Sequence, residues 1–349
     1  MCIRTCLINK LRIAVILAVS CVFFLFLAEA GFRLIPKKNN FRHAFELSQF
    51  KSDNPNINTL NRADWRPRFR PSSIVGYEKI PNSSPEVNSY GMTGKEYRSK
   101  KEKNIFRILV LGDSITEFDW YVRSLEDKLN NDPKASHKFE LWNAGVCGYE
   151  VNQYANYLKF KGLRYKPDMV LIGLCLNDFN VRGTLITYKD KKGFTGYYYS
   201  GYGLQRALPI NSFLFRSSYL YRFLYITLDN FLINQDPGKF IDERVRTGRT
   251  CLKEIKELCG SRNIGLTVVI FPYLKPVKEY NPEEYKNIIL VLEALKIDFI
   301  DLHDFFPRDR ESLEKLRFFK DDFIHPSREG HEIAAKAIFD HLYEKNFIN

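Results

Sequence analysis

The sequence lacks the residue spacings of a metal, redox or disulfide site. Among its seven cysteines there is no Cys-x-x-Cys pair, and the stretch HEIAA at His331 lacks the second histidine of a zinc-protease helix. Cys251 and Cys259 stand eight residues apart in a segment of helical periodicity, which separates them by about 12 Å, too far for a disulfide. We therefore expect no metal and no other cofactor.

Two common motifs of α/β enzymes are also missing. No Gly-x-Gly-x-x-Gly follows the apolar run at 106–111, and Asp113 would repel a pyrophosphate there, which argues against a dinucleotide site. Thr116 stands where the second glycine of a Gly-x-Ser-x-Gly motif around Ser114 would be. A dinucleotide enzyme and an α/β-hydrolase nucleophile turn are both disfavoured.

The composition is that of a globular protein, with 45% hydrophobic and 27% charged residues. The net charge is +12, but the lysines and arginines are scattered and form no basic stripe with interleaved aromatics. We expect a solvated basic surface and no nucleic-acid partner, and nothing in the sequence predicts an obligatory protein partner.

The longest apolar run, at 13–32, predicts export. It contains one charged residue, Glu29, and basic residues precede it, which places the N-terminus in the cytoplasm and the rest of the chain outside. Its length suits one membrane span, so we favour an uncleaved anchor. Cleavage near the small residues 28–30 and lipid attachment at Cys21 are the alternatives.

The chain is predicted to divide into three parts: an anchor at 1–35, a polar stalk and lead-in at 36–100, and a main domain at 101–349. An aromatic-rich insertion without a clear strand is expected at 181–240, and it includes GFTGYYYSGYG. We favour a lid packed on the domain, and the alternative is tyrosines that stack on sugar rings.

The main domain alternates short apolar runs with helical periodicity. The runs at 106–111, 139–143, 168–174, 265–271 and 297–302 read as buried strands, and helices are expected near 118–129, 241–259, 282–295 and 328–344. Strands joined by helices form parallel sheets with both faces covered. The predicted fold is a three-layer α/β/α sandwich with a mostly parallel five-stranded sheet.

Polar or glycine residues follow the first three predicted strands. Ser114, Gly145 and Asn177 are spaced by about one strand–helix repeat, so they should converge at the carboxyl edge of the sheet, where ligands bind. Asp322 and His325, just before the last helix, supply a base for the serine and a carboxylate that orients the base. The sequence therefore predicts a catalytic triad in the order Ser, Asp, His.

Four stretches, GDSIT, NAGVCG, GLCLND and DFIHP, resemble the four sequence blocks of the SGNH, or GDSL, hydrolase family, in the same order. The resemblance extends over about residues 88–345. It implies a flavodoxin-like fold, Ser114 as nucleophile and Asp322 with His325 as its partners. It also implies an oxyanion hole formed by the amides of Ser114 and Gly145 and the Asn177 side chain.

The sequence departs from the family pattern at two places. Cys175 occupies the usual glycine position of the third block, which puts the local backbone shape in question, and Glu117 and Phe118 follow DSIT where many members have a glycine.

We expect a serine esterase that removes ester groups, O-acetyl groups in particular, from a cell-envelope or extracellular carbohydrate. The alternatives are an O-acyltransferase to a polysaccharide, a lipase or lysophospholipase, and a non-catalytic envelope-binding protein. The expected partners are a small-molecule or polysaccharide ester and the membrane, through the N-terminal helix.

Overall fold

The computed structural model describes residues 2–34, 69–72, 74–179, 186–190, 193–197, 214, 218–235, 237–279, 282–345 and 347. The chain divides into two compact units. One unit combines Met1–Asp53 with Arg182–Pro237, and the other combines Asn54–Val181 with Gly238–Asn349. The predicted boundaries at 35, 100 and 181–240 remain predictions.

The second unit contains a five-stranded sheet, as predicted. In spatial order its strands are β4 (Lys138–Asn143), β3 (Ile105–Gly112), β5 (Met169–Cys175), β8 (Gly265–Phe271) and β9 (Asp298–Asp301). Each of the four pairings is parallel, with Val110 opposite both Asn143 and Leu171. This parallel sheet with covering helices confirms the predicted fold class.

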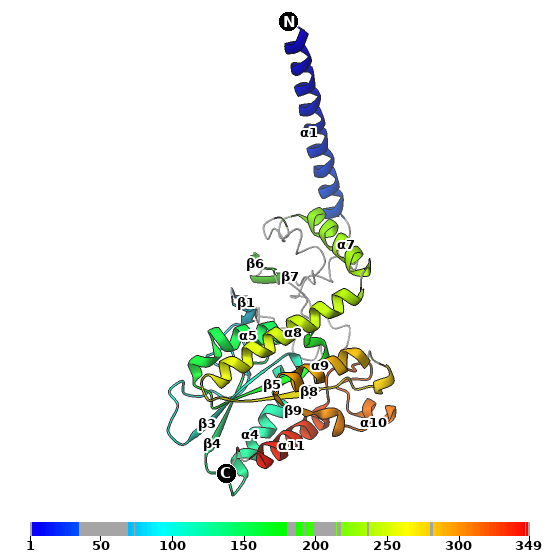
Figure 1. Cartoon of the computed structure of the whole chain (residues 1–349). Helices are drawn as coiled ribbons and strands as arrows, with labels where there is room; N and C mark the ends of the chain where they lie inside the picture. The colour runs from blue at the N-terminus through cyan, green and yellow to red at the C-terminus, as the bar shows by residue number, and fades with distance from the viewer. Residues whose placement is uncertain are drawn as a thin grey trace. The chain divides into compact units, whose positions relative to one another are not determined.

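Both faces of the sheet are buried, because successive side chains of a strand point to opposite faces. Ile108 and Val110 belong to a core cluster with residues of helices α4 and α11. Leu109 points the other way and lies close to Leu158 of α5. Figure 1 shows the two helical layers. The layers contain α4 (Trp120–Asn131) and α11 (Arg328–Glu344) on one face, and α5 (Val151–Phe160) and α8 (Pro237–Gly260) on the other.

Shorter elements complete this unit. They are α3 (Ser114–Glu117), α9 (Pro282–Ala294), α10 (Arg310–Lys315) and the 3-10 helices η2 (Gly162–Tyr165), η3 (Leu176–Phe179), η4 (Val277–Glu279) and η5 (Leu302–Asp304). Cys175, at the position where the family has glycine, ends β5 without a positive φ, so a side chain is tolerated there.

The described part of the lead-in, from residue 69 onward, contains a hairpin. Strands β1 (Phe69–Ser72) and β2 (Gly76–Lys79) form an antiparallel hairpin, and Val75, Lys79 and Met92 are buried with 2%, 3% and 1% exposure. Side-chain burial, invisible in a polar and turn-rich sequence, makes this segment part of the main unit. Residues 36–68 of the predicted stalk lie outside the described residues.

The first unit contains the N-terminal helix α1 (Cys2–Leu34), the helix α7 (Tyr219–Gln235) and a hairpin of β6 (Ile186–Asp190) and β7 (Gly193–Tyr197). The expectation that 181–240 contains no strand was wrong. Its strand β6, ITYKD, alternates apolar and polar residues only over a short run, and two glycines lie in β7, GFTGY, so the pattern did not stand out as a hairpin. The tyrosines of GFTGYYYSGYG lie outside the residues whose side chains are described, whereas Tyr219, Tyr221 and Tyr225 of the same insertion lie in α7.

One side chain fills the space left by three glycines at the carboxyl edge of the sheet. Methyl groups added to Gly112, Gly145 and Gly173 would lie 1.9, 2.6 and 2.6 Å from atoms of the Thr116 side chain. The Thr116 hydroxyl also contacts the Tyr121 hydroxyl at 2.9 Å. Because these three residues are glycines, the ends of three consecutive strands can approach the short helix α3 closely. Any other residue at these positions would overlap Thr116.

We expect Gly112→Ala to lower the free energy of unfolding by about 1–3 kcal/mol or more, because the new methyl group overlaps Thr116. Gly260→Ala is the matched control: a methyl group there meets nothing within 4 Å at the end of α8, so stability should stay equal or rise by about 0.5–1 kcal/mol. Urea unfolding of the full chain, followed by tryptophan fluorescence, measures both. Equal effects of the two substitutions would contradict the packing argument.

Candidate active site

Ser114 lies directly beyond the end of β3, as the first residue of α3. Asp113 is the N-cap of this helix: its carboxylate accepts a hydrogen bond from the Ile115 amide at 2.9 Å, which satisfies one free amide of the first turn. The Ser114 hydroxyl lies 3.2 Å from the same carboxylate. Asp113 is thus the cap of α3, and Ser114 is the residue that this cap positions.

The structure brings Asp322 and His325 to Ser114. One Asp322 oxygen accepts hydrogen bonds from the amides of Ile324 and His325 at 3.0 Å, which closes a tight turn before α11. The other lies 2.8 Å from His325 Nδ1, and His325 Nε2 lies 2.8 Å from Ser114 Oγ. With the proton on Nδ1, Nε2 is free to accept the hydroxyl proton of Ser114.

The charges around His325 favour its protonated form. Burial alone would lower the pKa of His325, but the hydrogen bond and charge of Asp322, together with the charge of Asp113, raise it above the usual value. Burial would raise the pKa of Asp322, but the hydrogen bonds that it accepts from His325 and Ile324 lower it. Asp322 therefore stays ionised beside an imidazole that holds a proton more strongly than usual.

Asn177 lies in η3, immediately after β5. The following residue, Asp178, fixes this turn, because its carboxylate accepts hydrogen bonds from the Cys175 amide at 2.7 Å and from the Tyr154 hydroxyl at 2.8 Å. Within the described chain, the Asn177 Oδ1 atom is buried without a hydrogen-bond partner, and no bond is formed by its amide nitrogen. The side chain thus holds an unused donor at the carboxyl edge of the sheet.

Gly145 does not fit its predicted role. It is buried, its amide donates to the Asn143 side chain at 2.9 Å, and its carbonyl accepts from Lys79 Nζ at 2.8 Å. Three residues further on, Gly148 is exposed, has a φ of 74° and forms no hydrogen bond through its amide in the described part of the chain. Gly145 is a packing glycine beside Thr116, and Gly148 is the glycine of this block with a free amide.

Nothing in the sequence indicated a role for Lys79, which contacts the loop after β4. Its ammonium group is buried and contacts the Thr93 hydroxyl, the Gly145 carbonyl and, at 3.5 Å, a carboxylate oxygen of Glu117. Burial lowers the pKa of Lys79, whereas the charge of Glu117 opposes this effect. The other oxygen of Glu117 accepts the Cys147 amide. Glu117, at a position of departure from the family pattern, therefore ties the lead-in to the loop that contains Gly148.

Aromatic side chains border the histidine. The Phe118 ring meets His325 edge-on at 5.7 Å and stacks on Trp120 at 5.0 Å. His331 is fully buried beside these rings, and neither ring nitrogen has a hydrogen-bond partner among the described residues. Burial lowers the pKa of His331 to about 3, so it is neutral and does not compete with His325 for protons.

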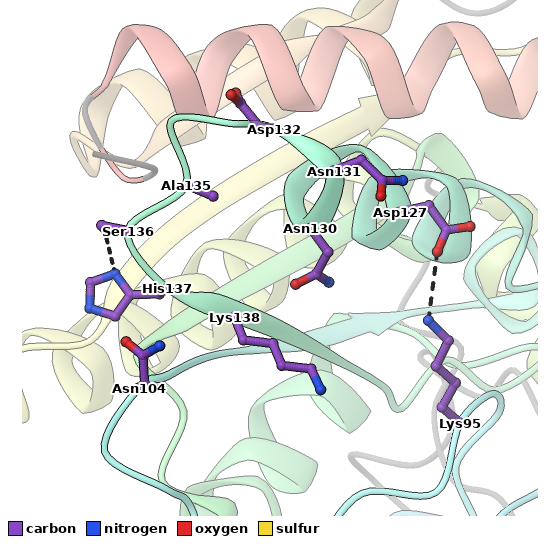
Figure 2. A pocket seen from close by; sticks show the side chains of 10 residues that line it. All are labelled: Lys95, Asn104, Asp127, Asn130, Asn131, Asp132, Ala135, Ser136, His137 and Lys138. Atoms are coloured by element: carbon purple, nitrogen blue, oxygen red, sulfur yellow. Dashed lines mark hydrogen bonds and ion pairs between the residues drawn. The ribbon is translucent and has the colours of Figure 1, made fainter.

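A surface pocket of about 490 Å³ lies elsewhere (Figure 2). It is lined by Asn104, which precedes β3, and by Lys138, which begins β4, so it opens at the amino edge of the sheet, away from Ser114. Two pairs of its lining side chains contact one another: Lys95 with Asp127 at 3.6 Å and Ser136 with His137 at 2.8 Å. Among the described residues, no group of three or more metal-ligating side chains occurs.

Comparison with known proteins points to one class. The model of the GDSL-like lipase/acylhydrolase family matches residues 110–333, more than half of the chain. Comparison with curated proteins finds no relative.

Solved structures with a similar fold include a lipase/acylhydrolase from Enterococcus faecalis, at 17% identity and a TM-score of 0.42 over 69% of this chain and 96% of that one. An acetylxylan esterase from Geobacillus stearothermophilus has 17% identity and a TM-score of 0.42, over 69% and 94%. A GDSL-like lipase from Bacteroides thetaiotaomicron has 13% identity and a TM-score of 0.38, over 68% and 88%.

The family match spans β3 from Val110, α3 and the turn before α11, and therefore includes Ser114, Asp322 and His325. By this match the chain belongs to the GDSL-like lipase/acylhydrolase family and is a serine hydrolase that acts on ester bonds.

Proposed function

We propose that the protein removes ester-linked acyl groups, O-acetyl groups in particular, from a cell-envelope or extracellular carbohydrate through an acyl-Ser114 intermediate. The observation that carries the chemistry is the pair of 2.8 Å contacts that joins Ser114 Oγ to His325 Nε2 and His325 Nδ1 to Asp322. An exported domain with an aromatic-rich insertion supports the choice of carbohydrate.

In the proposed reaction, His325 Nε2 takes the proton of Ser114 as the oxygen attacks the ester carbonyl carbon. The protonated imidazole, stabilised by Asp322, then returns this proton to the leaving alcohol as the carbon–oxygen bond breaks. Water enters, gives a proton to His325 and attacks the acyl carbon. The bond to Ser114 Oγ then breaks, His325 returns the proton to this oxygen, and the acid leaves.

Negative charge that develops on the carbonyl oxygen needs donors at the carboxyl edge of the sheet. The unused side-chain amide of Asn177 supports its role as one of these donors. For the second donor we propose Gly148 in place of Gly145, because of the two only Gly148 has a free N–H. The Ser114 amide is the third donor by resemblance, although in the free protein it also interacts with the Asp113 carboxylate.

The acceptor decides between hydrolysis and transfer, because the same acyl-serine can pass its acyl group to water or to a sugar hydroxyl. Incubation of the protein with an acetyl donor and a glycan separates the two outcomes. Free acetate supports the esterase, whereas acetylated glycan supports the transferase. Release of fatty acid from a phospholipid, without either product, would favour the lipase alternative.

We further propose that α1 is a retained anchor and that the hydrolase domain lies outside the cytoplasmic membrane. Val15–Leu34 is 20 residues long, has a mean hydropathy of 2.4, and none of its residues is fully buried. At 1.5 Å per residue it covers about 30 Å, the thickness of a hydrocarbon core.

The pH dependence of kcat/KM tests the assignment of His325 as base. Only the neutral imidazole accepts a proton, and the pKa of His325 is raised, so activity should be lost as the pH falls through a midpoint above 6.5. Asp322→Asn should lower the maximum value of kcat/KM on the order of 10⁴-fold and move the midpoint of its pH profile to lower pH. A wild-type midpoint below 6.5, or one that the substitution leaves in place, would contradict the assignment.

The oxyanion role of Asn177 predicts a loss in kcat. Asn177→Ala should lower kcat by about 10² to 10³ and leave KM nearly unchanged, because the donor acts mainly in the transition state. Turnover of a short-chain nitrophenyl ester measures the effect, and circular dichroism confirms the fold of the variant. Unchanged turnover would exclude this role.

Labelling by a fluorophosphonate probe tests the nucleophile without knowledge of the natural substrate. The full-length protein should be labelled at Ser114, and Ser114→Ala should abolish labelling. Ser136→Ala is the matched control, because Ser136 lines the pocket at the other edge of the sheet, and it should be labelled normally. Persistent labelling of the Ser114→Ala protein would overturn the mechanism.

A further inference from the structure

The helix α7 of the insertion is fastened to the end of α1. Glu29 of α1 accepts hydrogen bonds from the Ser218 hydroxyl at 2.8 Å and from the amides of Tyr219 and Leu220 at 3.1 and 2.9 Å. The two amides belong to the first turn of α7, where backbone amides have no carbonyl acceptor within the helix. A carboxylate placed there also interacts favourably with the positive end of the helix dipole.

Two further contacts join the same two helices. The rings of Phe32 and Phe223 lie 4.8 Å apart, and the Arg33 guanidinium lies 5.5 Å from the centre of the Tyr219 ring. Arg33 also pairs with Glu29 at 2.8 Å. Hydrogen bonds, an aromatic pair and a cation–π contact therefore hold the first turns of α7 against the last turns of α1.

The position of Glu29 fixes the depth of this junction. It lies five residues before Leu34, the end of the candidate span, which corresponds to about 7.5 Å along the helix. A charged side chain at that depth requires partners, and α7 and Arg33 supply them. Interfacial helices bury their apolar face about 5–10 Å into the boundary between headgroups and acyl chains, which is the depth at which α7 begins.

The described side chains of α7 include an exposed apolar stripe. Leu224, Leu228 and Phe231 are 53%, 46% and 57% exposed, and their spacing of four and three residues places them along one side of the helix. Tyr225, at 3% exposure, belongs to a buried side. A soluble protein gains nothing from this stripe, whereas a helix that begins at a membrane surface can bury it in lipid.

We propose that α7 is an interfacial helix whose stripe of Leu224, Leu228 and Phe231 inserts into the outer surface of a phospholipid bilayer. The inference rests on the proposed retention of α1 as a membrane anchor. Removal of α1 at the small residues 28–30 would take away the cap of α7 or leave it at a chain end. The insertion is then a second membrane contact, which limits the movement of the hydrolase relative to the bilayer.

Photo-crosslinking of the full chain in phosphatidylcholine–phosphatidylglycerol vesicles tests the proposal. A diazirine amino acid replaces Leu228, and two reference variants carry it in place of Ile16 of α1 and of Leu290 of α9, an exposed leucine outside this unit. We expect lipid adducts from positions 16 and 228 at about ten times the level from position 290, because burial in the bilayer and not mere exposure brings lipid into reach.

The outcomes separate the two hypotheses. Lipid adducts from position 16 with only background from position 228 would overturn the interfacial helix and leave the anchor intact. Background at both positions would overturn the anchor and the helix together. Equal adducts from positions 228 and 290 would show that exposure alone accounts for the labelling and would also overturn the proposal. Phe231 offers a second labelling position in the stripe if the Leu228 variant does not fold.

Discussion

The close approach of α3 to three strand ends is the constraint on which the rest of the active site depends. Thr116 occupies the space that side chains at Gly112, Gly145 and Gly173 would need, so β3, β4 and β5 all end against the same turn of helix. Ser114 lies two residues before Thr116 and is therefore held in place by packing and not by a strained backbone. Asp113 also orients α3. Its carboxylate lies at the end of β3 and accepts a hydrogen bond from the Ile115 amide in the first turn of the helix.

A second layer of contacts fixes the loop after β4. The Asn143 side chain donates to the Thr116 carbonyl and to Asp119, both at 2.8 Å, and accepts the Gly145 amide. Lys79 then links Gly145 and Glu117 from the opposite side. The amides of residues 144–147 are therefore all hydrogen-bonded, and Gly148 has the first free amide of the loop. Burial of the Lys79 ammonium or the Glu117 carboxylate alone would cost free energy. As a pair, the two groups fix the conformation of this loop.

The sequence was sufficient for the sheet because strands buried on both faces read as continuous apolar runs, and all five predicted strands lie within a residue or two of the observed bounds. It also indicated Asp322 and His325, because their contact is local. The sequence indicated Gly145 for the oxyanion hole, and it could not point to Gly148, because that proposal depends on which amide the Asn143 side chain occupies. The role of Lys79 could not be predicted, because its partners come from three separate segments of the sequence: Thr93, Gly145 and Glu117. The hairpin β6–β7 was missed because both strands are only five residues long and β7 contains two glycines.

The lead-in hairpin has a practical consequence for the boundaries of the protein. The segment that matches the family begins at residue 110, yet the ammonium group that neutralises Glu117 comes from β2, far upstream. A recombinant fragment cut at the start of β3 would keep each residue of the proposed triad and still leave a carboxylate uncompensated beneath the loop. The smallest self-sufficient hydrolase in this chain therefore starts before the hairpin, so truncation should be planned from buried contacts and not from the extent of sequence similarity.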